Sequence, residues 1–308
     1  MSIKEGDGDL STYIIENANW AKDSMITQTS LLVKDDKISA IRDRFSYYRY
    51  MRMDVSSFMM IPGHVMCDLE VPEITDFLSI KSYYLDEFIH KGCTTVLTAF
   101  NLGYEYEFLA KLNERKTSLL NSPLDYTIGL KTSANLITPT VIRSCKRHKV
   151  PVVWIDIDEL ESFKEIRWGW IKECLYDYPI TFVPFFTTNI DKKTKLKRLK
   201  IWQNTMENEK IPHLSNEIPQ KEPMRLEELK KIGIYPLRGN FLVGGELSYN
   251  LYMNVEGETG AEPLAFKIDH HVLKCTMNKG KCYYLNNRGY YYPGAGEELV
   301  IQTPGYFI

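Results

Sequence analysis

The sequence of 308 residues lacks the features that mark membrane and secreted proteins. Its longest apolar runs, such as ITFVPFF at residues 180–186, are far too short to cross a bilayer. The first residues, MSIKEGDGDLSTY, contain no apolar core of a signal peptide. The net charge is only −2, which provides no general attraction to nucleic acid or to an anionic membrane. We therefore expect a cytoplasmic protein that binds neither membranes nor nucleic acid.

Motifs of several common catalytic sites are also missing. The sequence has no G-x-S-x-G nucleophile turn, no G-x-x-x-x-G-K-[ST] phosphate loop and no G-x-G-x-x-G after a predicted strand. The six cysteines are scattered without a C-x-x-C pair, which indicates reduced and mostly buried thiols. With only six histidines, the supply of nitrogen ligands for a metal is modest.

What the sequence does contain falls into three parts. Residues 1–58 alternate apolar and polar positions and predict a hairpin with one buried face, with the charged turn KDDK inside its second segment. Residues 59–235 alternate strand-like and helix-like segments. Residues 236–308 return to β character, rich in glycine and tyrosine. We expect the first and last parts to form one small β-sandwich domain beside a central α/β domain.

The middle part predicts parallel β-α units. Its helices include one that begins at Thr138-Pro139, where threonine caps the helix and proline occupies the first helical position. The basic run DKKTKLKRLK at residues 191–200 is expected to be a solvated helix face, with an anion- or nucleic-acid-binding patch as the alternative. The strands are mostly apolar throughout, as in a barrel or a doubly wound sheet. The strand candidates are residues 59–70, 93–100, 125–133, 150–157 and 180–186.

The order of these pieces resembles the amidohydrolase superfamily, and most closely its dihydroorotase and hydantoinase branch. Three segments carry the likeness: PGHVMCDLE at residues 62–70, GCTTVLTAF at 92–100 and GIYPLRGNFLVGGELSYNL at 233–251. The resemblance implies a TIM-like (β/α) barrel with a small β domain. Because the chain is short for that family, we expect a reduced or incomplete barrel that has lost length after residue 186.

The resemblance also implies metal-assisted hydrolysis of a C–N bond. Its metal ligands would be two histidines on the first strand, a lysine on the fourth, histidines on the fifth and sixth, and an aspartate on the eighth. In this sequence Asp68 and Glu70 occupy the positions of the first two histidines. The fourth strand candidate has no lysine and the fifth has no histidine. We therefore expect that the usual binuclear metal site is not assembled, and that no metal cofactor is bound.

Asp68 and Glu70 leave two interpretations open. Alternate residues of a strand point to the same face, so both carboxylates would face the barrel mouth. They could hold one divalent cation, or act as an acid–base pair, because carboxylates suit Mg²⁺ or Mn²⁺. Alternatively, they are polar residues that are hydrogen-bonded or solvated at the rim, which is the interpretation we favour.

Four further residues are candidates for the pocket or for a metal. Cys67 lies on the first strand, Lys131 is the only lysine within a strand candidate, and Asp156 lies near the end of the fourth strand candidate. His213 falls near the position of a sixth-strand histidine, but a loop histidine is the simpler interpretation. Asp269, His270 and His271 form a tempting cluster, although adjacent histidines on a strand point to opposite faces.

Two classes of function follow. The first is a non-catalytic amidohydrolase-like protein with a degenerate metal site. It would act as a binding or partner subunit, as a homo-oligomer or in a complex with an active hydrolase. The second is a metal-dependent hydrolase of cyclic amides that uses an atypical carboxylate site. A weaker third possibility is a small-molecule sensor. We favour the first class.

Overall fold

The structure is a computed structural model, and it describes residues 12–22, 25–71, 76–158, 160–188, 190–254 and 271–306. The chain divides into two compact units. Unit 1 comprises Met1–His64, Ile89–Gly92 and Asn240–Tyr290, and unit 2 comprises Val65–Phe88, Cys93–Gly239 and Tyr291–Ile308. The division into domains with boundaries after residues 58 and 235, which the sequence indicated, stays a prediction.

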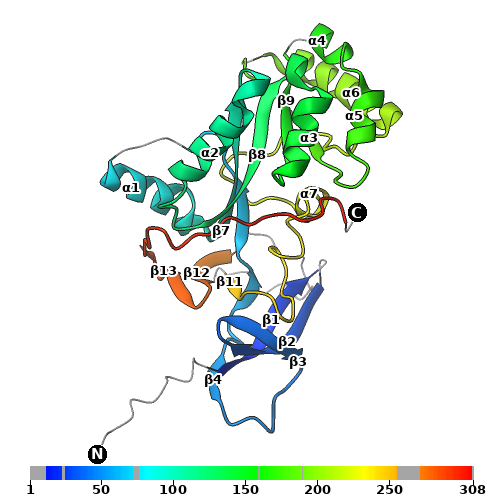
Figure 1. The fold of residues 1–308 in the computed structure, drawn as a ribbon. Coiled ribbons are helices and arrows are strands. Elements are labelled where there is room, and N and C mark those ends of the chain that lie inside the picture. The colour runs from blue at the N-terminus through cyan, green and yellow to red at the C-terminus, as the bar shows by residue number, and fades with distance from the viewer. Residues whose placement is uncertain are drawn as a thin grey trace, which may run out of the picture. The chain divides into compact units, whose positions relative to one another are not determined.

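Unit 1 is built on a mostly antiparallel sheet of nine strands, several of which are labelled in Figure 1. The order is β14-β13-β12-β11-β5-β1-β2-β3, and β4 pairs with β1. The bounds are β1 Tyr13–Lys22, β2 Met25–Lys34, β3 Lys37–Arg42, β4 Met51–Asp54, β5 Met59–Pro62, β11 Ser248–Asn254, β12 His271–Asn278, β13 Lys281–Leu285 and β14 Arg288–Gly289.

Strand β5 joins the two halves of this sheet, because it pairs with β1 on one side and with β11 on the other. All nine strands therefore belong to one hydrogen-bonded sheet, whereas the sequence analysis expected a two-sheet sandwich. The charged turn is confirmed: Asp35 and Asp36 both have positive φ, as a tight turn between β2 and β3 requires.

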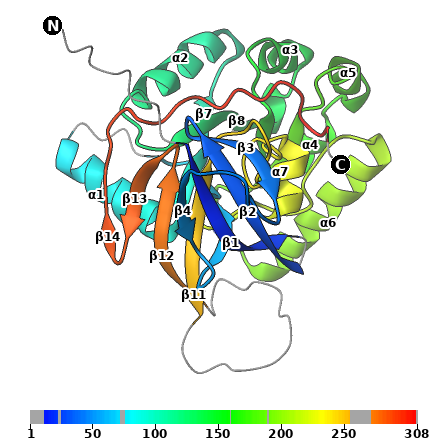
Figure 2. The ribbon, with the colours of Figure 1, turned by 90° about the horizontal axis from the view of Figure 1, so that it is seen from below.

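Unit 2 contains a curled sheet of five parallel strands in the order β10-β9-β8-β7-β6. Each strand lies beside its predecessor in the chain, and the connecting helices run along the outside of the curve (Figure 2). The strands are β6 His64–Cys67, β7 Cys93–Leu102, β8 Asp125–Ser133, β9 Val152–Asp156 and β10 Thr181–Phe185. This half-barrel sheet is the part of the expected barrel that is present among the described residues.

The helices begin where the sequence provides caps. Thr138 accepts a hydrogen bond from the Val141 N–H at 3.3 Å and Pro139 follows it, which confirms the expected start of α3. Asp191 caps α6, and the predicted basic helix face is the solvated side of a helix that buries Leu199 and Trp202. The α-helices are α1 Phe77–Glu87, α2 Phe108–Ser118, α3 Pro139–Arg147, α4 Leu160–Lys164, α5 Trp168–Cys174, α6 Lys192–Glu209 and α7 Leu226–Ile232.

The strand candidate at residues 59–70 is two strands in different sheets. Gly63 separates β5 from β6, and its N–H donates to Ser248 O at 3.1 Å. After Cys67 the extended segment ends, so Asp68 and Glu70 lie in the turn that follows the strand. The remaining four strand candidates agree with β7 to β10 within about two residues at each end, as boundary assignments usually do.

One segment without regular secondary structure, residues 211–224, closes both edges of the parallel sheet. We call it the strap. At the β10 edge, Phe182 N–H donates to Pro212 O and Leu214 N–H donates to Phe182 O, each at 2.9 Å. At the β6 edge, Lys221 N–H donates to Cys67 O and Met224 N–H donates to Val65 O, each at 2.8 Å. The strap therefore satisfies backbone groups that a half-barrel would leave unpaired.

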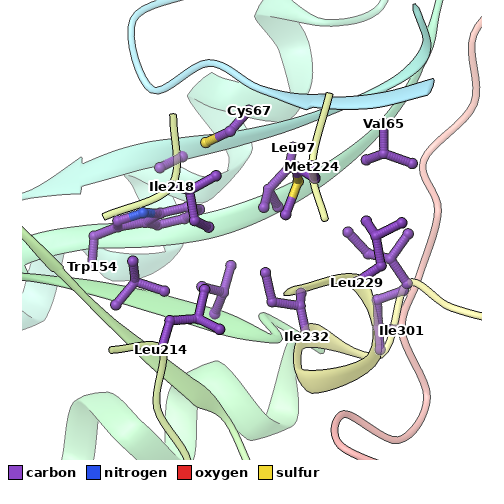
Figure 3. Close-up of a cluster of buried hydrophobic side chains, with 14 of the residues drawn as sticks. Val65, Cys67, Leu97, Trp154, Leu214, Ile218, Met224, Leu229, Ile232 and Ile301 are labelled. Atoms are coloured by element: carbon purple, nitrogen blue, oxygen red, sulfur yellow. The ribbon is translucent and has the colours of Figure 1, made fainter. Parts of the chain in front are cut away.

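The hydrophobic core of unit 2 fills the concave side of the sheet. Alternate residues of the strands point inward, including Val65 and Cys67 of β6 and Trp154 of β9, and they meet α7 and the strap (Figure 3). Trp154 and Ile218 lie together at one end of this cluster, away from Val65. The described residues contain no helix that is long and apolar enough to cross a membrane.

Candidate functional site

A cavity of about 600 Å³ opens at the C-terminal ends of the parallel strands of unit 2. This is the edge at which sheets of β-α units place their ligand sites, because the loops that follow the strands converge there. Strands β8, β9 and β10 contribute residues near their C-terminal ends, the turn after β6 contributes three more, and the strap provides the opposite wall. The lining residues are Asp68, Leu69, Glu70, Tyr83, Lys131, Trp154, Pro184, Phe185, Phe186, Glu217, Ile218, Pro219, Gln220 and Lys221.

Asp68 is buried at the rim of this cavity, with only 1% of its surface exposed. Its Oδ1 accepts the Glu70 N–H at 2.9 Å, and its Oδ2 accepts a hydrogen bond from the Tyr83 hydroxyl of α1. Burial, and then the hydrogen bond to Asp68, raises the pKa of Tyr83, so this phenol stays protonated and donates. Asp68 therefore fastens α1 to the end of β6.

Glu70 also lines the cavity, but its side chain is exposed. The two carboxylates expected at one mouth are thus brought to the same cavity from a turn rather than from a strand. Burial separates them, because Asp68 is enclosed by hydrogen bonds while Glu70 is open to water.

Lys131 projects from the inner face of β8, two residues beyond Gly129. Its Nζ lies 4.9 Å from the centre of the Phe185 ring, a distance typical of a cation–π contact. Gly129 is needed below it because a Cβ there would overlap the Trp154 ring and come within 2.6 Å of Val152 Cγ1. The missing side chain at Gly129 lets Trp154 form the floor of the cavity under Lys131.

Three other residues that the sequence indicated lie outside the lining of the cavity. Cys67 is fully buried in the core, and burial raises the pKa of its thiol, which opposes a role as a nucleophile. Asp156 Oδ2 accepts the Thr187 hydroxyl at 2.6 Å, and this bond ties the end of β9 to the turn after β10.

His213 lies in the strap beside Phe182, near the start of β10. Its Nδ1 is 2.8 Å from Ile211 O, and burial lowers its pKa, so it is a loop histidine of the kind expected. His271 begins β12 of unit 1, and Asp269 and His270 lie outside the described residues. In the described ranges, no group of three or more His, Cys, Asp or Glu side chains is arranged to hold a metal ion.

Sequence reasoning missed most of the cavity. Trp154 and Phe185 are strand residues whose alternation could have indicated that they face the interior near the strand ends. Tyr83, on the helix α1, and Gln220 and Lys221, in the strap, had no local signal, because only tertiary contacts bring them to the cavity. Gln220 Oε1 accepts the Leu69 N–H at 2.9 Å, which joins the strap to the turn after β6.

Comparisons with known proteins agree with the outline read from the sequence. No protein-family model matches the chain, and no curated protein matches it. A D-hydantoinase structure aligns with a TM-score of 0.64 at 10% identity, covering 94% of this chain and 99% of that one. The L-hydantoinase (dihydropyrimidinase) from Arthrobacter aurescens aligns with a TM-score of 0.60 at 12% identity, with coverage of 94% and 99%.

A third structure, the dihydropyrimidinase from Brevibacillus agri NCHU1002, has a TM-score of 0.59 at 12% identity and coverage of 95% of this chain and 99% of its own. Identities this low show the fold alone. The expected likeness is confirmed only as a similarity of fold to these hydantoinase and dihydropyrimidinase structures, and the expected loss of length and of metal ligands stays a prediction. The chain has a fold that resembles that of hydantoinases and dihydropyrimidinases.

Proposed function

We propose that this chain is a non-catalytic, amidohydrolase-like protein that binds a small molecule at the C-terminal ends of strands β6 to β10. It would act alone or as a partner subunit of an active hydrolase. The observation that carries the proposal is the state of Asp68. By the sequence resemblance this carboxylate stands where a first-strand metal ligand is expected, yet a tyrosine hydroxyl and a backbone N–H already bind its two oxygens. These bonds support a structural role.

The fourth and fifth strands support the same conclusion. The resemblance implies a lysine on the fourth strand and a histidine on the fifth, both aimed at a metal. Counted from β6, these strands are β9 and β10, and they present Trp154 and Phe185 to the cavity. An indole and a phenyl ring provide no ligand for a divalent cation, but they suit the binding of a flat organic molecule.

Metal analysis combined with an activity assay tests the proposal. Protein purified without chelator should contain far less than one equivalent of Zn²⁺, Mn²⁺ or Mg²⁺. It should hydrolyse neither hydantoin nor dihydrouracil faster than a heat-denatured control does. Small organic ligands should still raise its melting temperature, because binding to the native state stabilises it by mass action. One tightly held metal per chain, with turnover that vanishes in Asp68→Ala, would overturn the proposal.

A hydrolase with a carboxylate site is the second candidate, because Asp68 and Glu70 line the same cavity. Oxygen ligands of this type would bind Mg²⁺ or Mn²⁺. In that case added Mn²⁺ should start the hydrolysis of cyclic amides, and Glu70→Gln should reduce it strongly while leaving folding unchanged. The cavity would equally serve a small-molecule sensor, for which binding occurs without turnover.

A further inference from the structure

The charged residues of the cavity differ in whether the protein already provides them with a partner. Asp68 is bonded to Tyr83 and to a backbone N–H. Glu217 forms an ion pair with Lys195 of α6. Of the charged side chains in the lining, Asp68 and Glu217 therefore already bind other parts of the protein that surround the cavity.

The two lysines of the lining form a matched pair. Lys131 Nζ lies 4.9 Å from the centre of the Phe185 ring, and Lys221 Nζ lies 4.9 Å from the centre of the Tyr83 ring. Lys221 also has a carboxylate partner, since Glu87 Oε1 is 3.6 Å from its Nζ. For Lys131, the described part of the chain provides the ring face and no carboxylate within ion-pair distance.

The position of Lys131 makes this unpaired charge significant. It is half-buried on the inner face of β8, above the floor formed by Trp154, and it is not a surface lysine surrounded by water. A half-buried ammonium loses part of its hydration, and a ring face compensates only a fraction of that loss. A ligand anion would complete its coordination.

The remaining walls favour a flat, apolar ligand body. Tyr83, Trp154, Phe185 and Phe186 contribute aromatic surface, and Trp154 and Phe185 belong to the packed core, which holds their rings in place. A volume of about 600 Å³ is within the range of small-molecule sites. A molecule with one ring and a short polar group would be largely enclosed.

The charge balance of the lining limits the anion to a single charge. Three carboxylates, on Asp68, Glu70 and Glu217, face two ammonium groups, on Lys131 and Lys221. A dianion such as a phosphate monoester would meet net repulsion from these walls, whereas a carboxylate can pair with Lys131 alone.

We infer that the cavity binds a small aromatic carboxylate, with the carboxylate on Lys131 Nζ and the ring against the aromatic walls. The inference rests on the proposed function and adds the chemical class of the ligand. Lys131 is then the residue that selects for negative charge, and Trp154 and Phe185 select for a planar body.

Binding of four small probes to three proteins tests the inference. The probes are benzoate, its neutral isostere benzamide, the cation benzylamine and the dianion phenyl phosphate, and the proteins are wild type, Lys131→Met and Lys221→Met. Benzoate should bind the wild type more tightly than the other three probes do. Lys131→Met should weaken benzoate by tenfold or more, as expected for a charge-assisted bond, while leaving benzamide unchanged. Lys221→Met should weaken it by less than about threefold, because Glu87 already pairs with Lys221.

A charge-retaining variant guards against misfolding. Lys131→Arg should recover most of the benzoate affinity, and raised salt should weaken benzoate in the wild type but not in Lys131→Met. The inference is wrong if benzamide binds as tightly as benzoate, if Lys131→Met keeps benzoate affinity, or if benzoate fails to bind up to its solubility limit. If benzamide binds as tightly as benzoate and its binding does not depend on Lys131, the inferred carboxylate ligand is wrong, but the proposed non-catalytic binding function is retained. Metal-dependent turnover beside Lys131-dependent benzoate binding would remove only the proposed function.

Discussion

The charged residues near the two ends of strand β8 differ in whether the protein provides an oppositely charged partner. At its first residue, Asp125 is fully buried and paired with Arg238 at 2.6 Å, and it accepts the Glu297 N–H at 3.0 Å. Near its last residue, Lys131 faces a cavity with an aromatic ring as its neighbour. The charge at the N-terminal end is thus paired within the protein, while at the C-terminal end we propose that a ligand anion pairs with Lys131. On this proposal, the N-terminal end of β8 serves stability and its C-terminal end serves ligand binding.

The largest effect is expected at the N-terminal end of β8. Asp125→Ala should lower the free energy of unfolding by about 3–5 kcal/mol, because the buried Arg238 guanidinium would lose the Asp125 carboxylate. Urea denaturation measures the loss. Asp177→Ala is the control, since its ion pair with Lys146 lies at the surface and should contribute less than about 1 kcal/mol. Equal losses in the two variants would contradict the contrast between the ends of β8.

A smaller effect is expected between the two ends. Gly129→Ala should destabilise the protein by about 1–3 kcal/mol, because the added methyl group collides with Trp154. It should also disturb the floor of the cavity and weaken ligand binding. Gly169→Ala is the matched control: this exposed position in α5 has nothing within 4 Å of an added Cβ, and alanine favours a helix. Thermal unfolding should show the first variant less stable than wild type and the second equal or more stable.

Acid is expected to destabilise unit 1 through His64. His64 Nε2 lies 2.8 Å from the Tyr252 hydroxyl, and burial lowers the pKa of this imidazole from 6.5 to about 4. As the pH falls, His64 of the unfolded chain binds a proton before His64 of the folded protein does. The contribution of His64 to the free energy of unfolding is therefore complete above about pH 6.5 and is lost towards pH 4. Because His64 as a residue is only half-buried, we expect a loss of about 1–2 kcal/mol. His64→Gln should flatten this part of the stability–pH curve, and an unchanged slope would assign the loss to other groups.

The smallest change in stability is expected at the open end. Lys131→Met removes a half-buried ammonium that has no carboxylate partner among the described residues, so unfolding free energy should change by less than about 1 kcal/mol, in either direction. A loss as large as that of Asp125→Ala would show that Lys131 holds the fold together. A negligible loss, beside the expected loss of benzoate binding, would show that the two ends of β8 have different roles.

Much of the fold could be predicted from sequence because its signals are local. Residues 93–100 and 125–133 are apolar runs bounded by polar segments, and β7 and β8 follow them closely. Thr138-Pro139 fixes the start of α3 by chemistry that involves only neighbours in the chain. The sequence also indicated Asp68, Glu70 and Lys131, since each lies at or near the C-terminal end of a predicted strand.

The rest of the candidate site depends on contacts between distant segments. Nothing near Asp68 in the sequence indicates that Tyr83 would bind it, because the two residues meet only when α1 packs beside β6. The two-sheet sandwich was expected because hydrophobic alternation identifies strands but not their neighbours, and β5 pairs with both β1 and β11. The strap has no periodic pattern at all, so its two sets of edge contacts were invisible.

The strap also has a consequence for resistance to aggregation. An open parallel half-barrel would expose two sheet edges whose unpaired backbone groups can bind other chains. The strap covers part of each edge with the same short segment. A single protease cut between Ile218 and Lys221 would therefore weaken the strap's contacts at the β6 edge and at the β10 edge together. The nicked protein should self-associate through them, which light scattering would detect as particle growth soon after cleavage.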